Sequence, residues 1–294
     1  MPAPALRSKL FVDGGDAAES RRIRDRLGRL DGQTTNPSLV AANPAIKERL
    51  QRGQKLTRKE AWAFYRELVG SIAEVTSGPI SIEVYADPTT TAADMLEQAR
   101  ELWTWIPNGV IKFPTTSPGL EAASTAVREG MRVNMTLCFS QEQAAAVYAA
   151  TRGTHQTAFV SPFVGRLDDR GENGMQLIEN ILRMYQAGDG HVEVLTASVR
   201  NLSHLLYAIA LGSPLITVPA KVLDAWTDQG YPVPDTRFRY DPGALKPIPY
   251  RETALDRPFA SYDARHELTD VGLRKFAENW NDILSDVPAA ARPR

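Results

Sequence analysis

The sequence predicts a single (β/α)8 barrel of the TIM type. Short apolar runs alternate with helical patterns from one end of the chain almost to the other, and regular strand–helix alternation is typical of a parallel sheet covered by helices. Eight such repeats over about 220 residues match this barrel. A doubly wound open sheet is the alternative, but it normally has a glycine-rich phosphate loop after an early strand, and the sequence contains none.

The eight predicted strands are short and mostly apolar. They cover residues 10–13, 32–35, 80–84, 110–113, 133–137, 158–161, 192–196 and 215–218. Signals for helix starts lie between them. Residues 57–60 and 140–143 have the spacing of capping boxes, and Asn43 before Pro44 fits an N-cap followed by proline at the first helical position.

Residues 227–268 break the alternation, because they are rich in proline and only weakly periodic. We predict a long surface excursion before the C-terminal helix, and not a second domain, so that 1–294 is one barrel domain. Thr269 is expected to cap a C-terminal helix at 269–285. The apolar face of this helix consists of Leu273, Phe276, Trp280, Ile283 and Leu284.

Composition is ordinary for a soluble globular protein, with 43% hydrophobic and 23% charged residues and a formal net charge of −1. Nothing in it points to nucleic acid or a membrane as partner. The single cysteine, Cys138, excludes an internal disulfide and fits a reducing cytosol. No stretch resembles a signal peptide or approaches the roughly 18 apolar residues of a membrane span. A cytoplasmic location is therefore expected.

Lys112 is the most informative residue, because it lies in the apolar run 110–114, which has the character of a buried strand. An unpaired buried ammonium is costly, so this lysine must lose its charge or find a partner. A neutral lysine is a nucleophile toward carbonyl carbon. The alternative is a structural lysine that pairs with a buried carboxylate or reaches water from a strand end.

Polar residues gather at the C-terminal ends of the predicted strands, where barrels of this type carry their chemistry. The polar residues are Asp13, Thr34, Asn36, Ser81, Glu83, Asn134, Thr136, Ser161, Arg166, Ser198 and Arg200, and the aromatic Phe163 lies among them. Each alone has an ordinary explanation; Arg166, for example, could pair with Asp168 or Asp169 at the surface. Together they surround one lysine, and buried polar groups need partners.

Such a set of groups would support carbon–carbon bond cleavage through a Schiff base. The lysine attacks a ketone and water is lost, and the protonated imine then accepts the electrons of the adjacent bond. A carboxylic acid and a held water move the protons, and amide and hydroxyl groups hold the sugar hydroxyls. Two arginines near a serine suit a phosphate, because the guanidinium fork matches its oxygens.

Six segments resemble the transaldolase family, in the family's order between residues 8 and 222. They are Phe11-Val12-Asp13 with Thr34-Thr35-Asn36-Pro37-Ser38-Leu39, Ser81-Ile82-Glu83-Val84, Ile111-Lys112-Phe113-Pro114-Thr115-Thr116, Val133-Asn134-Met135-Thr136-Leu137, Ser161-Pro162-Phe163-Val164-Gly165-Arg166 and Ala197-Ser198-Val199-Arg200-Asn201. Two features depart from the family pattern. Tyr85 follows Glu83-Val84 where the family usually has Asp, and 227–268 matches no segment of it.

The resemblance implies a role for each candidate residue. Lys112 would form the Schiff base, and Glu83 would shuttle protons through a water held by Thr136. Asp13 would take the proton from the hydroxyl at the breaking bond, and Phe163 would keep the imine site dry. The dihydroxyacetone unit would be bound by Asn36, Asn134 and Ser161, supported by Thr34 and Ser81. The phosphate would be bound by Arg166, Ser198 and Arg200.

The resemblance thus implies a transaldolase that moves dihydroxyacetone from sedoheptulose 7-phosphate or fructose 6-phosphate to an aldose phosphate, in the non-oxidative pentose phosphate pathway. It implies no cofactor and no metal, and the four histidines lack ligand spacing. Three alternatives stay open: a lyase resembling fructose 6-phosphate aldolase, a relative acting on another sugar phosphate, and a non-catalytic sugar-phosphate-binding barrel. Against the lyase, Glu83 and Phe163 replace the Gln and Tyr that the aldolase subgroup has.

The oligomeric state is not determined by the sequence. The C-terminal helix with Trp280 could close the mouth of the barrel or form an interface in a homo-oligomer.

Overall fold

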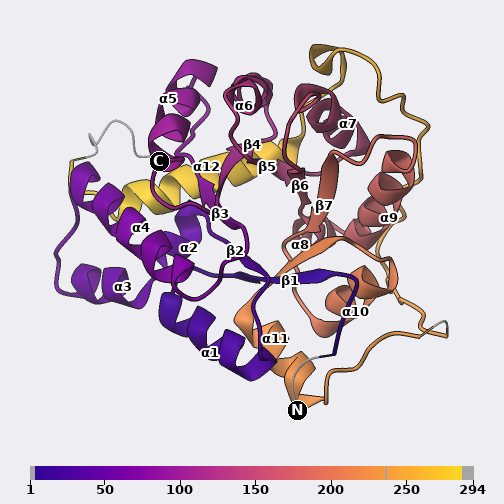
Figure 1. The fold of residues 1–294 in the computed structure, drawn as a ribbon, viewed down its shortest axis with the longest axis horizontal. Helices are drawn as coiled ribbons and strands as arrows, with labels where there is room; N and C mark the ends of the chain where they lie inside the picture. Colours follow the sequence, from indigo (N-terminus) through magenta and orange to yellow (C-terminus); the bar gives the residue numbers. More distant parts are fainter. Residues whose placement is uncertain (1–3, 236, 287–294) are drawn as a thin grey trace.

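The computed structural model describes residues 4–235 and 237–286. Its eight strands form a closed parallel barrel in the order β1 to β8, and β1 pairs with β8 to complete the ring (Figure 1). The strands are β1 Lys9–Asp13, β2 Gly32–Thr34, β3 Ile80–Glu83, β4 Gly109–Pro114, β5 Val133–Cys138, β6 Ala158–Pro162, β7 Val192–Thr196 and β8 Leu215–Val218. The predicted (β/α)8 barrel is confirmed, and the open sheet is excluded.

Helices surround this barrel (Figure 1). They are α1 Ala17–Leu27, α2 Pro37–Ala41, α3 Pro44–Gln51, α4 Arg58–Ala73, α5 Ala92–Leu102, α6 Ser117–Arg128, α7 Gln141–Ala150, α8 Val164–Asp169, α9 Gly174–Tyr185, α10 Leu202–Ala210, α11 Ala220–Asp228 and α12 Glu267–Asp282, with a 3-10 turn η1 at Phe259–Ser261.

Two of the three predicted helix starts are as expected. Thr57 and Glu60 form a reciprocal capping box at α4, and Asn43 caps α3. At α7 Ser140 is the N-cap, but Gln143 does not return the hydrogen bond to it. The side chain of Gln143 instead accepts from the backbone N–H of Phe139, so this start is a simple cap.

The last helix begins earlier than predicted. His266, not Thr269, is the N-cap of α12, and its Nδ1 accepts from the backbone N–H of Leu268. The Thr269 hydroxyl faces the barrel and donates to the carbonyl oxygen of Leu137 at 2.9 Å. A side chain used in tertiary packing cannot also cap the helix, which explains the wrong prediction for Thr269.

Helix α12 packs against α2 and the C-terminal end of β5, and it crosses the barrel as the yellow helix of Figure 1. Trp280 on its apolar face is buried and contacts the rings of Trp62 and Tyr65. Phe276, one turn earlier, reaches the cavity at the mouth of the barrel. The helix therefore covers part of that mouth.

The segment between α11 and α12 runs around the outside of α10, α9 and α7, drawn from orange to yellow in Figure 1. Apart from η1, its described residues form no helix. Backbone hydrogen bonds join Lys246 to Gly171 and Asn173, and Arg251 exchanges two hydrogen bonds with the Gln141 side chain. The segment is thus attached to the barrel at several points.

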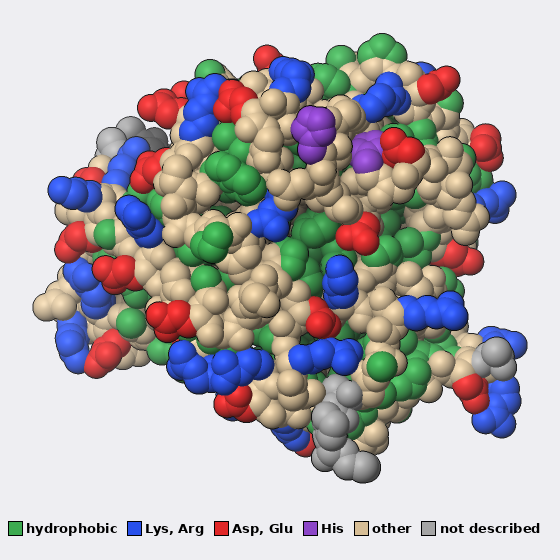
Figure 2. Space-filling view, viewed as in Figure 1, with side chains coloured by type: hydrophobic (Ala, Val, Ile, Leu, Met, Phe, Trp, Pro, Cys, Tyr) green, Lys and Arg blue, Asp and Glu red, His purple; other side chains and the backbone are tan. Residues whose placement is uncertain are grey.

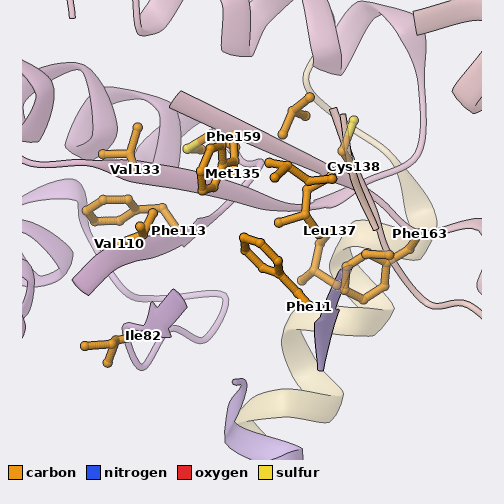
Figure 3. Packing of buried hydrophobic residues seen from close by; sticks show 14 of the residues in the cluster. Phe11, Ile82, Val110, Phe113, Val133, Met135, Leu137, Cys138, Phe159 and Phe163 are labelled. Carbon is orange, nitrogen blue, oxygen red and sulfur yellow. The ribbon is translucent and has the colours of Figure 1, made fainter. Parts of the chain in front are cut away.

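Apolar side chains fill the lower part of the barrel. The rings of Phe11 from β1 and Phe159 from β6 meet edge to face, with centroids 6.5 Å apart, and Figure 3 shows both among the buried apolar side chains of the core. Residues on one strand alternate between the two faces of the sheet, so Asp13 points inward like Phe11, two positions before it. The polar residues of the mouth therefore lie above this apolar floor.

The described part of the chain has no helix long and apolar enough to cross a membrane. On the face drawn in Figure 2, acidic and basic side chains are interspersed among the described residues.

Candidate active site

The register of the strands brings the predicted residues together. Glu83 of β3 pairs with Lys112 of β4, and Lys112 pairs with Asn134 of β5. On the other side of the mouth, Asp13 of β1 pairs with Thr34 of β2. Because all the strands run in parallel, these side chains share the C-terminal end of the barrel.

Lys112 is 2% exposed and has two partners. Its Nζ lies 2.9 Å from Glu83 Oε2, and it donates a hydrogen bond to the carbonyl oxygen of Thr35 at 3.1 Å. The contact with Glu83 has ion-pair distance without hydrogen-bond alignment at the oxygen. The buried ammonium has thus found a carboxylate, and that carboxylate is placed to exchange a proton with the amine.

The two carboxyl groups of the site hold protons more tightly than usual. Burial raises the pKa of Glu83, although the positive charge of Lys112 opposes the shift. Burial also raises the pKa of Asp13, against the charge of Lys112 and a hydrogen bond from Thr34. A carboxyl with a raised pKa can release and take up protons closer to neutral pH, as general acid–base catalysis requires.

Hydrogen bonds fix the polar groups around the lysine. Ser161 Oγ donates to Asn134 Oδ1 at 2.7 Å, and Asn134 Nδ2 donates to Ser81 Oγ at 3.0 Å. Thr34 Oγ1 donates to Asp13 Oδ1 at 2.7 Å. This network ties together strands that are far apart in sequence, so the side chains are held in place before a ligand arrives.

Two other groups retain hydrogen-bonding capacity. Thr136 is fully buried, and its Oγ1 has no hydrogen-bond partner among the residues described. Asn36 caps α2 with Oδ1, which accepts from the backbone N–H of Leu39. Asn36 lines the cavity, and its amide group carries N–H donors in addition to this oxygen.

A cavity of about 230 Å³ opens above the lysine. The predicted residues that line it are Asp13, Thr34, Asn36, Lys112, Ser161, Phe163, Arg166, Ser198 and Arg200. Four further predicted residues, Ser81, Glu83, Asn134 and Thr136, are not part of this lining. Ser81, Glu83 and Asn134 pair in the sheet with lining residues, and Thr136 pairs with Pro114. A larger surface cavity, about 420 Å³, is lined by none of the predicted residues.

Arg166 and Arg200 have different surroundings. The Arg166 guanidinium lies 5.3 Å from the ring centroid of Phe163 and 5.1 Å from that of Phe276. Arg200 is more exposed and donates to Asp169 at 2.9 Å. The surface pairing considered for Arg166 is therefore wrong, because Arg200 takes Asp169 and Arg166 is held between two aromatic rings.

Other residues of the site were not predicted. Thr217 of β8, 2.6 Å from Thr34 Oγ1, and Lys221 of α11 both line the cavity. Thr217 could have been found by applying the strand-end rule to the eighth strand. The Tyr65 hydroxyl accepts from the backbone N–H of Glu83 and contacts Thr35 Oγ1; its position in an apolar helical stripe concealed this role.

Across residues 4–235 and 237–286, no three His, Cys, Asp or Glu side chains are arranged to hold a metal ion.

Comparisons with known proteins show the family of the chain. The model of the Transaldolase/Fructose-6-phosphate aldolase family matches residues 10–287. A "Probable transaldolase" of Brucella ovis is 39% identical over 272 residues, which are 92% of this chain and 96% of the relative. One of Rhodospirillum centenum is 42% identical over 216 residues, 73% of this chain and 82% of the relative.

These observations define an enzyme built on a (β/α)8 barrel. The chain belongs to the transaldolase/fructose-6-phosphate aldolase family. The matched range 10–287 includes the segment 227–268, so the prediction that this segment matches nothing in the family is wrong. Among solved structures, a phosphoenolpyruvate phosphomutase from Streptomyces platensis subsp. rosaceus has a TM-score of 0.48 at 12% identity, covering 78% of this chain and 81% of that chain; a similarity of this size carries no argument here.

Proposed function

We propose that this chain is a transaldolase, which transfers a dihydroxyacetone unit from a ketose phosphate to an aldose phosphate through a Schiff base on Lys112. The observation that carries the proposal is the buried contact between Lys112 and Glu83 beneath a cavity lined by Asp13, Arg166 and Arg200. The site thus combines a nucleophile, Lys112, with the carboxyl groups of Glu83 and Asp13. Arg166 and Arg200 form the cationic rim of the cavity. Sedoheptulose 7-phosphate and fructose 6-phosphate are the proposed donors.

The first step is imine formation. Glu83 takes the proton from the Lys112 ammonium, and the neutral amine attacks the ketone carbon of the donor. The hydroxyl of the carbinolamine leaves as water when Glu83 returns the proton. Thr136 Oγ1, buried and without a described partner, would hold the water that carries protons between Glu83 and the reacting oxygen.

The second step breaks the carbon–carbon bond. Asp13 takes the proton from the hydroxyl on the far side of that bond, the carbonyl of the leaving aldose forms, and the bonding electrons pass to the iminium, which becomes an enamine. The raised pKa of Asp13 favours this uptake. Attack of the enamine on the carbonyl of an acceptor aldose then reverses the step, and hydrolysis of the new imine releases the product.

Transfer rather than hydrolysis requires the three-carbon unit to stay on the lysine. Phe163 lines the cavity and is 7% exposed, so its ring shields the imine from water. Asn134 and Ser161 would hold the hydroxyls of the bound unit through the amide and hydroxyl groups that face it. Arg166, Ser198 and Arg200 would hold the phosphate, which matches the guanidinium fork.

Borohydride trapping tests the proposal. With fructose 6-phosphate, we expect a reduced three-carbon adduct on Lys112 by peptide mass mapping, and erythrose 4-phosphate should deplete it. Lys112→Met keeps the apolar stem and should lose the adduct, with turnover lowered about 10³-fold or more. Lys221→Met is the matched control, since Lys221 lines the same cavity and the adduct should still form on Lys112.

The family description also covers aldolases, so the same experiment must separate transfer from cleavage. Release of free dihydroxyacetone from fructose 6-phosphate without an acceptor, at the rate of transfer, would make the enzyme a lyase. An adduct on another lysine would overturn the proposal. Its setting would be the non-oxidative pentose phosphate pathway in the cytoplasm, where the buried free thiol of Cys138 would stay reduced.

A further inference from the structure

A buried histidine lies behind the cationic rim of the cavity. His204 of α10 is 2% exposed. Its Nε2 lies 2.7 Å from Asp168 Oδ2, and its Nδ1 lies 3.3 Å from the backbone nitrogen of Arg200, whose N–H donates to it. The proposed mechanism has no use for this histidine, and it does not reach the cavity.

These two contacts determine the tautomer of the ring. Nδ1 accepts the backbone N–H of Arg200, so the proton of the neutral imidazole is on Nε2 and is donated to Asp168. The other oxygen of Asp168 accepts from the backbone N–H of Gly174 at 3.0 Å. Both oxygens of the carboxylate are therefore occupied, and the histidine is held firmly in one orientation.

The histidine joins the two segments that carry the cations. Asp168 lies in α8, two residues after Arg166. Arg200 follows β7 in the segment that also holds Ser198. His204 contacts both segments and is a second link between them, beside the backbone hydrogen bonds that join them directly.

The segment after β7 needs such support. Ser198 has φ of 59°, in the left-handed region that residues other than glycine rarely adopt. It is also pressed against α8: a Cβ on Gly165 would lie 2.3 Å from Arg200 Nε and 2.4 Å from the carbonyl oxygen of Ser198. The Gly165 N–H donates to that oxygen at 3.0 Å. The segment of Ser198 and Arg200 is therefore strained and packed closely against α8. The hydrogen bond to His204 supports it from the side of α10.

The segment between α11 and α12 covers this anchor. The Tyr240 ring lies 6.3 Å from the His204 ring and stacks on Tyr207 of α10, with centroids 4.7 Å apart and an interplanar angle of 1°. Aromatic packing here keeps water away from the imidazole, and a hydrogen bond shielded from water is stronger. The excursion thus contacts the site indirectly, through α10.

We propose that His204 and Asp168 are positioning residues for the phosphate group of the substrate. They hold the segment of Ser198 and Arg200 against the helix of Arg166, and Tyr240 shields them. The inference rests on the proposed function only in requiring that this cavity binds a phosphate ester.

Two substitutions separate the contacts of the histidine. In His204→Asn the side-chain oxygen replaces Nδ1, so the acceptor for Arg200 remains. In His204→Gln the amide nitrogen replaces Nε2, so the donor to Asp168 remains and the acceptor is lost. We expect His204→Gln to raise the KM for fructose 6-phosphate about tenfold while kcat stays within about twofold, and His204→Asn to raise KM clearly less.

Unphosphorylated fructose provides the internal control, because its KM should not respond to either variant. Binding of inorganic phosphate, measured by calorimetry without turnover, should weaken in parallel with the KM change. Tyr240→Leu is a second variant, outside the buried pair, and should weaken phosphate binding in the same direction.

The outcomes are distinguishable. Equal KM changes for fructose and fructose 6-phosphate, or unchanged phosphate binding in all three variants, would overturn the positioning role. Weakened phosphate binding in the variants of an enzyme that forms no adduct on Lys112 would support the positioning role while the proposed transfer reaction fails.

Discussion

Lys112 and Glu83 form an ion pair that is almost fully removed from water, with both side chains less than 5% exposed. Such pairs contribute little net stability, because desolvation offsets the attraction between the charges. The proposed function gives this pair a chemical role, since the same contact would provide a proton acceptor at the nitrogen of the proposed nucleophile.

Glu83→Gln tests the proton transfer. The amide keeps the size of the side chain but cannot take up a proton, so we expect kcat to fall about 10²- to 10⁴-fold. Because burial raises the pKa of Glu83, the acidic limb of the kcat profile should lie above the ordinary range for glutamate and be absent in the variant.

Steady-state rates across pH check this, with urea unfolding as the measure of intact folding. A variant that kept both its kcat and the acidic limb would remove Glu83 from the mechanism.

The sequence predicted thirteen site residues, and the structure places them at one end of the barrel. Alternation along strands and the strand-end rule were enough, because both depend only on local spacing. The roles of Tyr65 and Lys221 were missed. Both residues lie on helices, and only the folded chain shows that they reach the strands or the cavity.

Among the elements, the C-terminal helix α12 differs most from its prediction. Leu137, at the irregular end of β5, has φ of 58°, and its carbonyl oxygen accepts from Thr269. The helix therefore docks on a bulged strand end, where local sequence signals for a cap are overridden by a tertiary contact. No local pattern could have predicted that competition.

A substitution at Gly272 of α12 tests the contact between this helix and Arg166. A Cβ there would lie 2.4 Å from Arg166 Nη1 and 2.6 Å from a methyl group of Leu137. Both are ends of flexible side chains, so Gly272→Ala should displace the guanidinium of Arg166 more than the helix. We expect a KM for fructose 6-phosphate raised several-fold, about tenfold at most, with little change in the free energy of unfolding.

Gly70 of α4 is the matched control, since it is also inside a helix and a Cβ there meets nothing within 4 Å. Gly70→Ala should stabilise the protein by about 0.5–1 kcal/mol and leave KM unchanged. Equal KM values for the two variants, by steady-state kinetics, would contradict the role of α12 in placing Arg166.

For the whole molecule, strand–helix alternation predicted the closed barrel and all eight strands. The path of residues 227–268 could not be predicted in this way. Their contacts include backbone hydrogen bonds of Lys246 and Arg251 and the stacked ring of Tyr240. Such contacts have no period along the chain, so the sequence could predict a surface segment but not its path.

The buried carboxyls make the stability of the whole chain depend on pH. The pKa of Asp13 is raised on folding, so the native state binds more protons than the unfolded chain between the ordinary aspartate pKa of about 4 and the raised value. Its contribution to stability is present below that window and is lost as pH rises through it. Asp13→Asn should therefore gain stability relative to the wild type as pH rises.

Urea unfolding at about pH 4 and about pH 8 measures this difference. Asp256→Asn, at an exposed position, is the control for a lost surface charge. If the wild type instead gained free energy of unfolding relative to Asp13→Asn between about pH 4 and about pH 8, the predicted direction of the pH dependence would be wrong.

The aromatic pair around Arg166 has a consequence for the order in which the protein is made. Phe163 follows the sixth strand, but Phe276 lies on α12, which comes after all eight strands in the chain. Chains emerge from the ribosome N-terminus first, so the barrel strands, complete at Val218, can close before this second ring exists. A nascent chain with Lys112 already in place still lacks the ring of Phe276 beside Arg166, so the proposed phosphate site would be completed after the lysine of the proposed Schiff base is in position.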